Sequence, residues 1–219
     1  MFGSQLTTLE TIAVAIIPMV YAVVLHEIAH GWVAWRLGDD TAYRMGRLTL
    51  NPISHIDPIG TILVPLVLLL VAGFAFGWAK PVPVNFSQLR HPRRDMAVVA
   101  VAGPAANLIM AIFWIIIIKL AAMLPESTGG LGYALFYMAL FGVLVNIVLM
   151  LFNLIPIPPA DGGRIAAGVL PPKAAQMLSR IEPYGLIILV VLLATGMIGK
   201  LLQPVIQSVL KLVQTIIGV

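Results

Sequence analysis

The chain has 219 residues, of which 60% are hydrophobic and only 10% are charged, and its formal net charge is +4. A soluble domain carries about 25% charged residues. This composition, with a mean hydropathy of +1.02, therefore excludes an ordinary soluble protein and indicates an integral membrane protein. The absence of cysteine excludes disulfides, thiolate metal ligands and a cysteine nucleophile. No nucleic-acid-binding pattern is present, and the length suits one membrane-embedded domain, 1–219.

Six segments approach the length of about 20 apolar residues that a membrane-spanning helix needs. We therefore expect an all-α polytopic fold with a catalytic core over about 8–165 and further helices over about 183–218. In chain order, the six segments are 8–37, 59–79, 95–124, 131–155, 184–198 and 201–217.

The first segment carries the motif HEIAH inside an otherwise apolar run. His26 and His30 are four residues apart, so they lie on one face of a helix, where two imidazoles can hold one zinc ion. Glu27, beside the first histidine, can act as general base toward the attacking water. Ionisable side chains in a membrane helix are costly and usually face an interior site. The alternative is that the motif is only the polar end of the helix, with both histidines bonded to carbonyl groups.

Lysine and arginine residues predict the orientation of these segments. They gather in the linkers after the first segment, before the third and after the fourth. Short basic linkers lie in the cytoplasm. At 1.5 Å per residue, His26 lies about 24 Å from Glu10, and Arg36 lies about 9 Å beyond His30. We therefore expect the site to lie inside the bilayer near the cytoplasmic face.

The first cytoplasmic linker has a different character. Its stretch YRMGRLTL, 43–50, alternates in part between polar and apolar residues and predicts a small β-hairpin. An edge strand formed by GRLTL could hold an unwound substrate by strand addition. Pro52 and Pro58 close this linker.

Segment 59–79 conflicts with the charge rule, because the linkers at both of its ends are basic. Pro65, Gly73 and Gly77 also weaken a straight helix. We expect this segment to re-enter or to lie tilted, with both ends cytoplasmic, and to pack against the site. The alternative is a plain spanning helix that breaks the charge rule.

Two histidines leave a catalytic zinc one protein ligand short. Asp161, in an irregular proline- and glycine-rich stretch at the same cytoplasmic end, would complete a His₂Asp site with one position open for water. Since Asp-Gly is a common turn pair, Asp161 could instead be only a turn residue. The competing ligands are His55, His91 and Asp57, of which Asp57 precedes a proline and is expected to cap a turn.

Three motifs occur in a fixed order: HEIAH, then AGPAANL at 102–108, then FNLIPIPPADGGR at 152–164. In this the chain resembles the site-2 protease family of intramembrane zinc metalloproteases. The resemblance implies a three-helix catalytic core and one Zn²⁺ per chain. It also implies roles for five residues: His26, His30 and Asp161 as zinc ligands, Glu27 as the catalytic glutamate, and Asn153 as a group that orients the substrate or the oxyanion. Gly103, Pro104 and Asn107 match a motif near the start of the middle core helix.

The expected function is that of an intramembrane zinc endopeptidase, in a minimal form without a PDZ or CBS domain. Its substrates would be single-pass or signal-peptide-like membrane proteins in a bacterial or archaeal plasma membrane. The alternatives are a non-proteolytic metal transporter, although the inverted repeats typical of transporters are missing from the sequence, and a scaffold for membrane partners. Asn107 and Asn146 are expected to form hydrogen bonds between helices.

Overall fold

The computed structural model describes residues 7–73, 77–125 and 130–217, and all regular structure in these ranges is helical. The main helices are α1 (Thr8–Arg36), α2 (Thr41–Arg44), α3 (Val64–Ala72), α4 (Pro92–Ala122), α5 (Gly130–Asn153), α6 (Asp161–Val169), α7 (Pro172–Ala194) and α8 (Met197–Ile217). Short 3₁₀ turns lie at Pro52–His55 and Phe86–Gln88, and a π-helical turn at Pro58–Leu63 precedes α3.

Helices α1, α4, α5 and α7 are long and apolar enough to cross a membrane, so the chain is a multi-pass membrane protein. The first, third and fourth predicted segments correspond to α1, α4 and α5. Helix α7 begins at Pro172, well before the predicted start at 184, because its first turns are polar and carry no hydropathy signal. Helix α8 is not among the candidate spans. It carries an exposed polar stripe formed by Lys200, Gln203, Gln207, Lys211 and Gln214.

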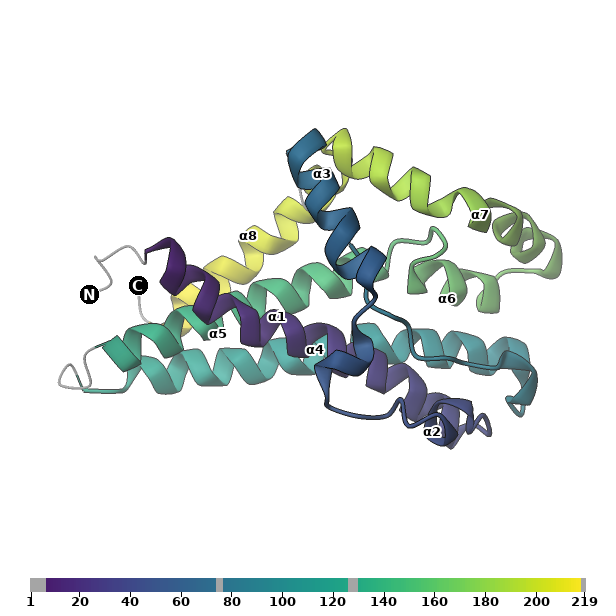
Figure 1. Ribbon diagram of the computed structural model, residues 1–219, viewed down its shortest axis with the longest axis horizontal. Helices are drawn as coiled ribbons and strands as arrows, with labels where there is room; N and C mark the ends of the chain where they lie inside the picture. Colours follow the sequence, from purple (N-terminus) through teal and green to yellow (C-terminus); the bar gives the residue numbers. More distant parts are fainter. Residues whose placement is uncertain (1–6, 74–76, 126–129, 218–219) are drawn as a thin grey trace.

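Helices α1, α4 and α5 pack against one another in pairs and form the predicted three-helix core, and in Figure 1 α1 crosses α4 and α5 obliquely. Small residues let α4 and α5 approach closely: Gly142 lies against the ring of Trp114, and Ala111, Ala139 and Val143 are fully buried in the same cluster. Helix α8 packs against α5 and α4, and its Val213 belongs to the same buried cluster.

The predicted β-hairpin over 43–50 is wrong: no strand occurs among the described residues. The beginning of this stretch belongs to α2, and Leu48 packs against Gly31 of α1. The nearest extended segment, 77–85, contains Pro81 and Pro83, which lack the N–H groups that a strand ladder needs. The Arg47 guanidinium instead donates to the carbonyl oxygens of Lys80 and Pro81, at 3.1 and 3.3 Å.

The predicted segment 59–79 is helical only over its first part, and its residues 74–76 lie outside the described residues. The helical part, 58–72, measures about 22 Å at 1.5 Å per residue, less than the roughly 30 Å of a hydrocarbon core. The backbone N–H of Trp78 donates to the carbonyl oxygen of Gly60 at 3.0 Å. The chain that follows α3 therefore returns to the start of the same helical segment. This geometry favours the expected re-entry over a plain spanning helix.

The close contact between α4 and α5 leads to a stability prediction. In Gly142→Ala the new Cβ would overlap the Trp114 ring, and overpacking of this kind costs about 1–3 kcal/mol. We expect a lower unfolding temperature for the detergent-solubilised protein. Gly130→Ala in the same helix is the matched control, because a Cβ there meets no atom within 4 Å. Equal unfolding temperatures for the two variants would contradict this packing.

Candidate metal centre

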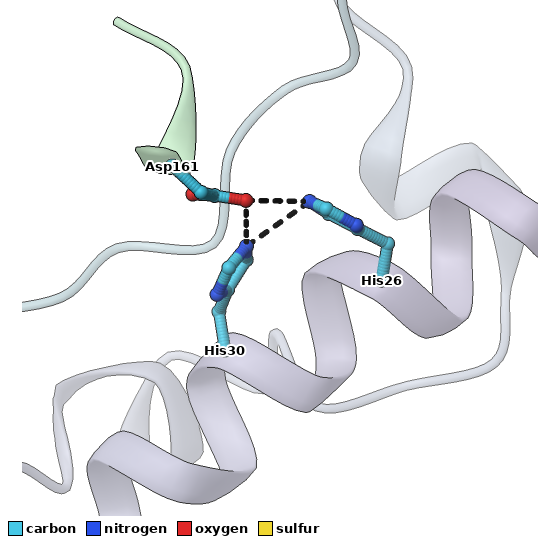
Figure 2. A group of neighbouring side chains, drawn as sticks. All are labelled: His26, His30 and Asp161. Atoms are coloured by element: carbon cyan, nitrogen blue, oxygen red, sulfur yellow. Dashed lines mark hydrogen bonds and ion pairs between the residues drawn. The ribbon is translucent and has the colours of Figure 1, made fainter. Parts of the chain in front are cut away.

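The two histidines of HEIAH point from α1 toward the first residue of α6, as Figure 2 shows. Their Nε2 atoms lie 3.1 Å apart. The Oδ2 atom of Asp161 lies 3.2 Å from His26 Nε2 and 3.1 Å from His30 Nε2. His26 is 7% exposed, His30 8% and Asp161 5%, so bulk water does not screen their charges. The fold thus brings together the three side chains predicted as zinc ligands.

Asp161 reaches this point through the turn between α5 and α6. Helix α5 ends at Asn153, and Pro156, Pro158 and Pro159 prevent it from continuing. Asp161 was expected on an irregular stretch but is the first residue of α6, where the helix dipole favours a carboxylate. A side chain at Gly162 would overlap the carbonyl oxygens of Leu154 and Ile155. The glycine therefore lets α6 begin close to the residues that follow α5.

Hydrogen bonds on the far side of each ring fix the histidine tautomers. His26 Nδ1 lies 2.6 Å from Asn107 Oδ1, and His30 Nδ1 lies 2.7 Å from the Val99 oxygen. The Asn107 amide is oriented by its own bonds, since its Nδ2 donates to the Ala22 oxygen and to Asn146 Oδ1. Both partners of the rings are acceptors, so each Nδ1 carries the proton and each neutral ring presents an Nε2 lone pair.

Three lone-pair donors therefore meet without a proton between them. Asp161 Oδ2 is buried and has no hydrogen-bond partner. A cation removes the mutual repulsion of such donors. A tetrahedral ion with bonds of about 2.0–2.1 Å would separate its ligands by about 3.3 Å, close to the distances observed. The donor set fits zinc.

Gly103 of α4 forms the floor of the cluster. A Cβ at this position would overlap His30 Nε2 and both His26 Cε1 and Nε2. The glycine in the AGPAANL motif therefore leaves the space next to the two ligand nitrogens open. Helices α1 and α4 also pack against each other. Gly103 therefore permits both this helix contact and access of a metal ion to the two nitrogens.

Glu27 lies next to the metal ligands, at the wall of a cavity of about 390 Å³ that also contacts His26, His30 and Asp161. Its Oε2 accepts a hydrogen bond from the Val82 N–H at 2.8 Å. Glu27 is half-buried, this bond ties its side chain to segment 77–85, and its other oxygen forms no hydrogen bond among the described residues.

The sequence is similar to YwhC of Bacillus subtilis (strain 168), which is named as a candidate zinc metalloprotease. The two are 40% identical over 206 residues, which cover 92% of this chain and 91% of that protein. The chain belongs to this zinc metalloprotease family. It is also similar to proteins with the same kind of name, both called Rip2. The one from Mycolicibacterium smegmatis is 31% identical over 80% of this chain and 64% of that protein. The one from Mycobacterium tuberculosis (strain ATCC 25618 / H37Rv) is 28% identical over 77% of this chain and 61% of that protein.

No family model matches the chain, and no solved structure matches at a significant level. The chain covers nearly all of YwhC but less than two thirds of either Rip2 protein. Membership of the metalloprotease family implies zinc, and the His26, His30 and Asp161 cluster is the one group of potential metal ligands among the described residues.

Asn153 is the last residue of α5 and lines the cavity of the metalloprotease. Its Nδ2 donates to the Leu149 oxygen of its own helix at 3.0 Å. An amide nitrogen carries two hydrogens, so one remains for a group inside the cavity. The expected role of Asn153 in orienting substrate stays a prediction.

The competing ligand candidates lie elsewhere. His55 Nε2 is 3.0 Å from the Thr49 oxygen. Asp57 caps the turn before α3, as predicted, by accepting from the N–H groups of Ile59 and Gly60, each at 2.9 Å. The His91 side chain is 72% exposed at the start of α4. None of the three joins the cluster.

The expectation that segment 59–79 packs against the site agrees with Gly77, Trp78 and Ala79, which line the metalloprotease cavity. Two other parts of the cavity were not predicted: the wall continues over Pro81, Val82 and Val84, and Arg164 of α6 also lines it. The helix–helix hydrogen bond expected for Asn107 and Asn146 is present at 2.9 Å, but the contact of Asn107 with His26 was also not predicted. Proline spacing in AKPVPVNF could have indicated an extended wall, whereas nothing in the sequence places Arg164 or pairs Asn107 with a ring.

Loss of the Asn107 contact should weaken zinc binding. In Asn107→Ala, His26 Nδ1 loses its acceptor, and outer-shell losses of this kind cost about 10–100-fold in metal affinity. Zinc affinity can be measured by competition with a chelating dye. Asn146→Ala is the matched control, because it removes the bond between helices but leaves the ring contact. If both variants lost the same affinity, Asn107 would act only through helix packing.

A methyl group at the floor should exclude the metal. Alanine is favoured over glycine in a helix by about 1 kcal/mol, yet in Gly103→Ala the Cβ would overlap both ligand rings. We expect purified Gly103→Ala protein to keep its helicity by circular dichroism and to lose most of its zinc by mass-spectrometric metal analysis. Full zinc content in this variant would contradict the described floor.

Proposed function

We propose that this metalloprotease is an intramembrane zinc endopeptidase of the site-2 type, which hydrolyses peptide bonds in transmembrane segments of other membrane proteins. The observation that carries the proposal is the His26, His30 and Asp161 cluster, buried among helices long enough to span a bilayer. A metal site built on such helices is suited to a peptide bond that also lies within the membrane.

The chemistry follows from the residues around the cluster. A bound zinc ion would supply Lewis-acid activation of water and polarisation of the scissile carbonyl. Glu27, held by the Val82 N–H, is placed to take the proton from the attacking water and to return it to the leaving amine. The remaining amide hydrogen of Asn153 can donate to the developing oxyanion, an interaction worth about 3 kcal/mol.

The cavity supports water exclusion around this chemistry. Apart from the residues named above, its walls are mainly apolar side chains: Val23, Val82, Val84, Val99, Leu149, Phe152, Leu186 and Leu189. A low-dielectric wall strengthens the electrostatic interactions inside the site. The same wall matches the apolar side chains of a transmembrane substrate.

A substrate helix hides its carbonyl groups in its own hydrogen bonds and must unwind before cleavage. The first linker was expected to hold the unwound segment, but it forms no strand. Segment 77–85 takes this place in the proposal, because it is extended, it lines the cavity and it carries the Glu27 contact at Val82. Substrates of the expected kind are single-pass or signal-peptide-like membrane proteins, reached near the cytoplasmic face.

The rival functions are a metal transporter and a non-catalytic scaffold. A transporter needs a metal site that opens alternately to two sides. Here, both histidine rings are tied to α4 by hydrogen bonds, and a carboxylate that does not belong to the ligand cluster faces the same cavity. A fixed site with a neighbouring base favours hydrolysis over transport.

Substitution of the proposed base separates these functions. In Glu27→Gln we expect zinc to stay bound and cleavage of model transmembrane peptides in proteoliposomes to fall by at least about 100-fold. Glu182→Gln, at an exposed position on α7, is the control. Mass spectrometry of the products and metal analysis of the same samples give the two readouts. Full activity of Glu27→Gln, or no cleavage by zinc-loaded wild type, would count against the protease.

A further inference from the structure

Arg164 is a cation at the cavity that the proposed chemistry does not use. It follows Asp161 by three residues on α6, so the two side chains lie on the same face of that helix. Among the described residues, Arg164 is the one lysine or arginine that lines the cavity. Its charge therefore faces the same space as the metal ligands.

An aromatic ring holds the Arg164 guanidinium in place. Its Cζ lies 5.6 Å from the centroid of Phe86. Phe86 itself packs on a buried cluster of Ala34, Leu89 and Val99. A guanidinium over an aromatic face is attracted by the ring while its five N–H donors remain in the plane available to a ligand. This contact positions the cation without neutralising it.

No carboxylate of the described residues forms an ion pair with Arg164. The two carboxylates at the cavity are engaged elsewhere: Asp161 faces the histidines and Glu27 bonds to Val82. Their two negative charges balance a divalent ion. The positive charge of Arg164 is then left over in a cavity with mainly apolar walls, where a partner of opposite charge is favoured.

We propose that Arg164 is a specificity-determining residue that binds a carboxylate of the substrate close to the scissile bond. The inference rests on the proposed function. Planar guanidinium groups match carboxylates with two parallel hydrogen bonds. The carboxylate has two possible sources, an Asp or Glu side chain within the substrate and the free C-terminal carboxylate of a peptide that has already been cut.

The distance from the scissile bond follows from the cavity wall. Glu27 contacts segment 77–85 at Val82, and Arg164 lies over Phe86, four residues further along the chain. Four residues span at most about 13 Å when fully extended, whereas Asp161 and Arg164 on one helix face are about 5–6 Å apart. An extended substrate would therefore place its carboxylate about two to four residues from the cleaved bond.

The test uses two series of apolar model transmembrane peptides with zinc-loaded protein in proteoliposomes. One series carries a single Asp at successive positions, with a Lys series as its counterpart. The other ends in a free or an amidated C-terminus at the same distances. Cleavage by wild type, Arg164→Gln, Arg164→Lys and Arg164→Glu is quantified by mass spectrometry. Arg180→Gln, at an exposed position on α7, is the control.

We expect wild type to cleave peptides with Asp at one or two of these positions at least tenfold better than the Lys counterparts. Arg164→Gln should remove this preference, Arg164→Lys should keep part of it and Arg164→Glu should reverse it, whereas Arg180→Gln should leave it unchanged. A preference that follows the free C-terminus instead of the side chain identifies the second source. An unchanged Asp to Lys ratio in Arg164→Glu would overturn the inference and leave the proposed protease intact.

A binding measurement keeps the two proposals separate. Fluorescence anisotropy with the zinc-loaded Glu27→Gln protein reports peptide affinity without cleavage. If wild type cleaved no peptide, the proposed protease function would be wrong. The carboxylate site would still be supported if Glu27→Gln bound the Asp peptide tenfold more tightly than the Lys peptide and Glu27→Gln/Arg164→Glu lost this difference. Equal binding of Asp and Lys peptides by Glu27→Gln would overturn it.

Discussion

The structure depends on one electrostatic constraint: three lone-pair donors meet at about the ligand spacing of a single tetrahedral ion, inside a protein whose surroundings cannot solvate them. His26 and His30 come from α1 and Asp161 comes from α6, more than a hundred residues away in sequence. Without a cation, the donors repel one another and the carboxylate oxygen lacks a hydrogen-bond partner. Occupation of the site by a metal would therefore also hold the end of α1 to the start of α6.

Helix packing and metal chemistry are linked through the second layer of contacts. Asn107 joins α4 to α1 through the Ala22 oxygen, to α5 through Asn146, and to the metal site through His26. One buried amide thus serves three helices and also sets a tautomer. Gly103, one turn earlier on α4, supplies the space for the ligand rings. Gly103 and Asn107 therefore serve both helix packing and the metal site. Both tasks need a small residue or a polar group whose hydrogen bonds are all formed.

The cavity is asymmetric, and this gives it a direction. One wall is the extended segment 77–85, tied down by backbone bonds from Trp78 to Gly60 and from Lys80 to His55. Leu186 and Leu189 of α7 also line the cavity, and Arg164 lies beside the Phe86 ring. In the proposed function, a peptide laid along this wall would meet Glu27, the proposed general base, at Val82 and the Arg164 cation further on. The order of these contacts would favour one N- to C-terminal direction for a peptide bound next to the metal site.

The sequence alone determined the membrane class, the three core helices and the candidate ligands, because these rest on local signals: hydropathy, an i to i+4 spacing and a proline- and glycine-rich turn. The helical start of α7 and the absence of a hairpin at 43–50 depended on the tertiary structure. Leu48 packs on α1, and Arg47 takes the carbonyl groups that a strand would need. The Asn107 contact, the part of the wall over 81–84 and the place of Arg164 were decided only by the fold. Each depends on which groups meet across helices, and a linear pattern records the groups but not the distances between them.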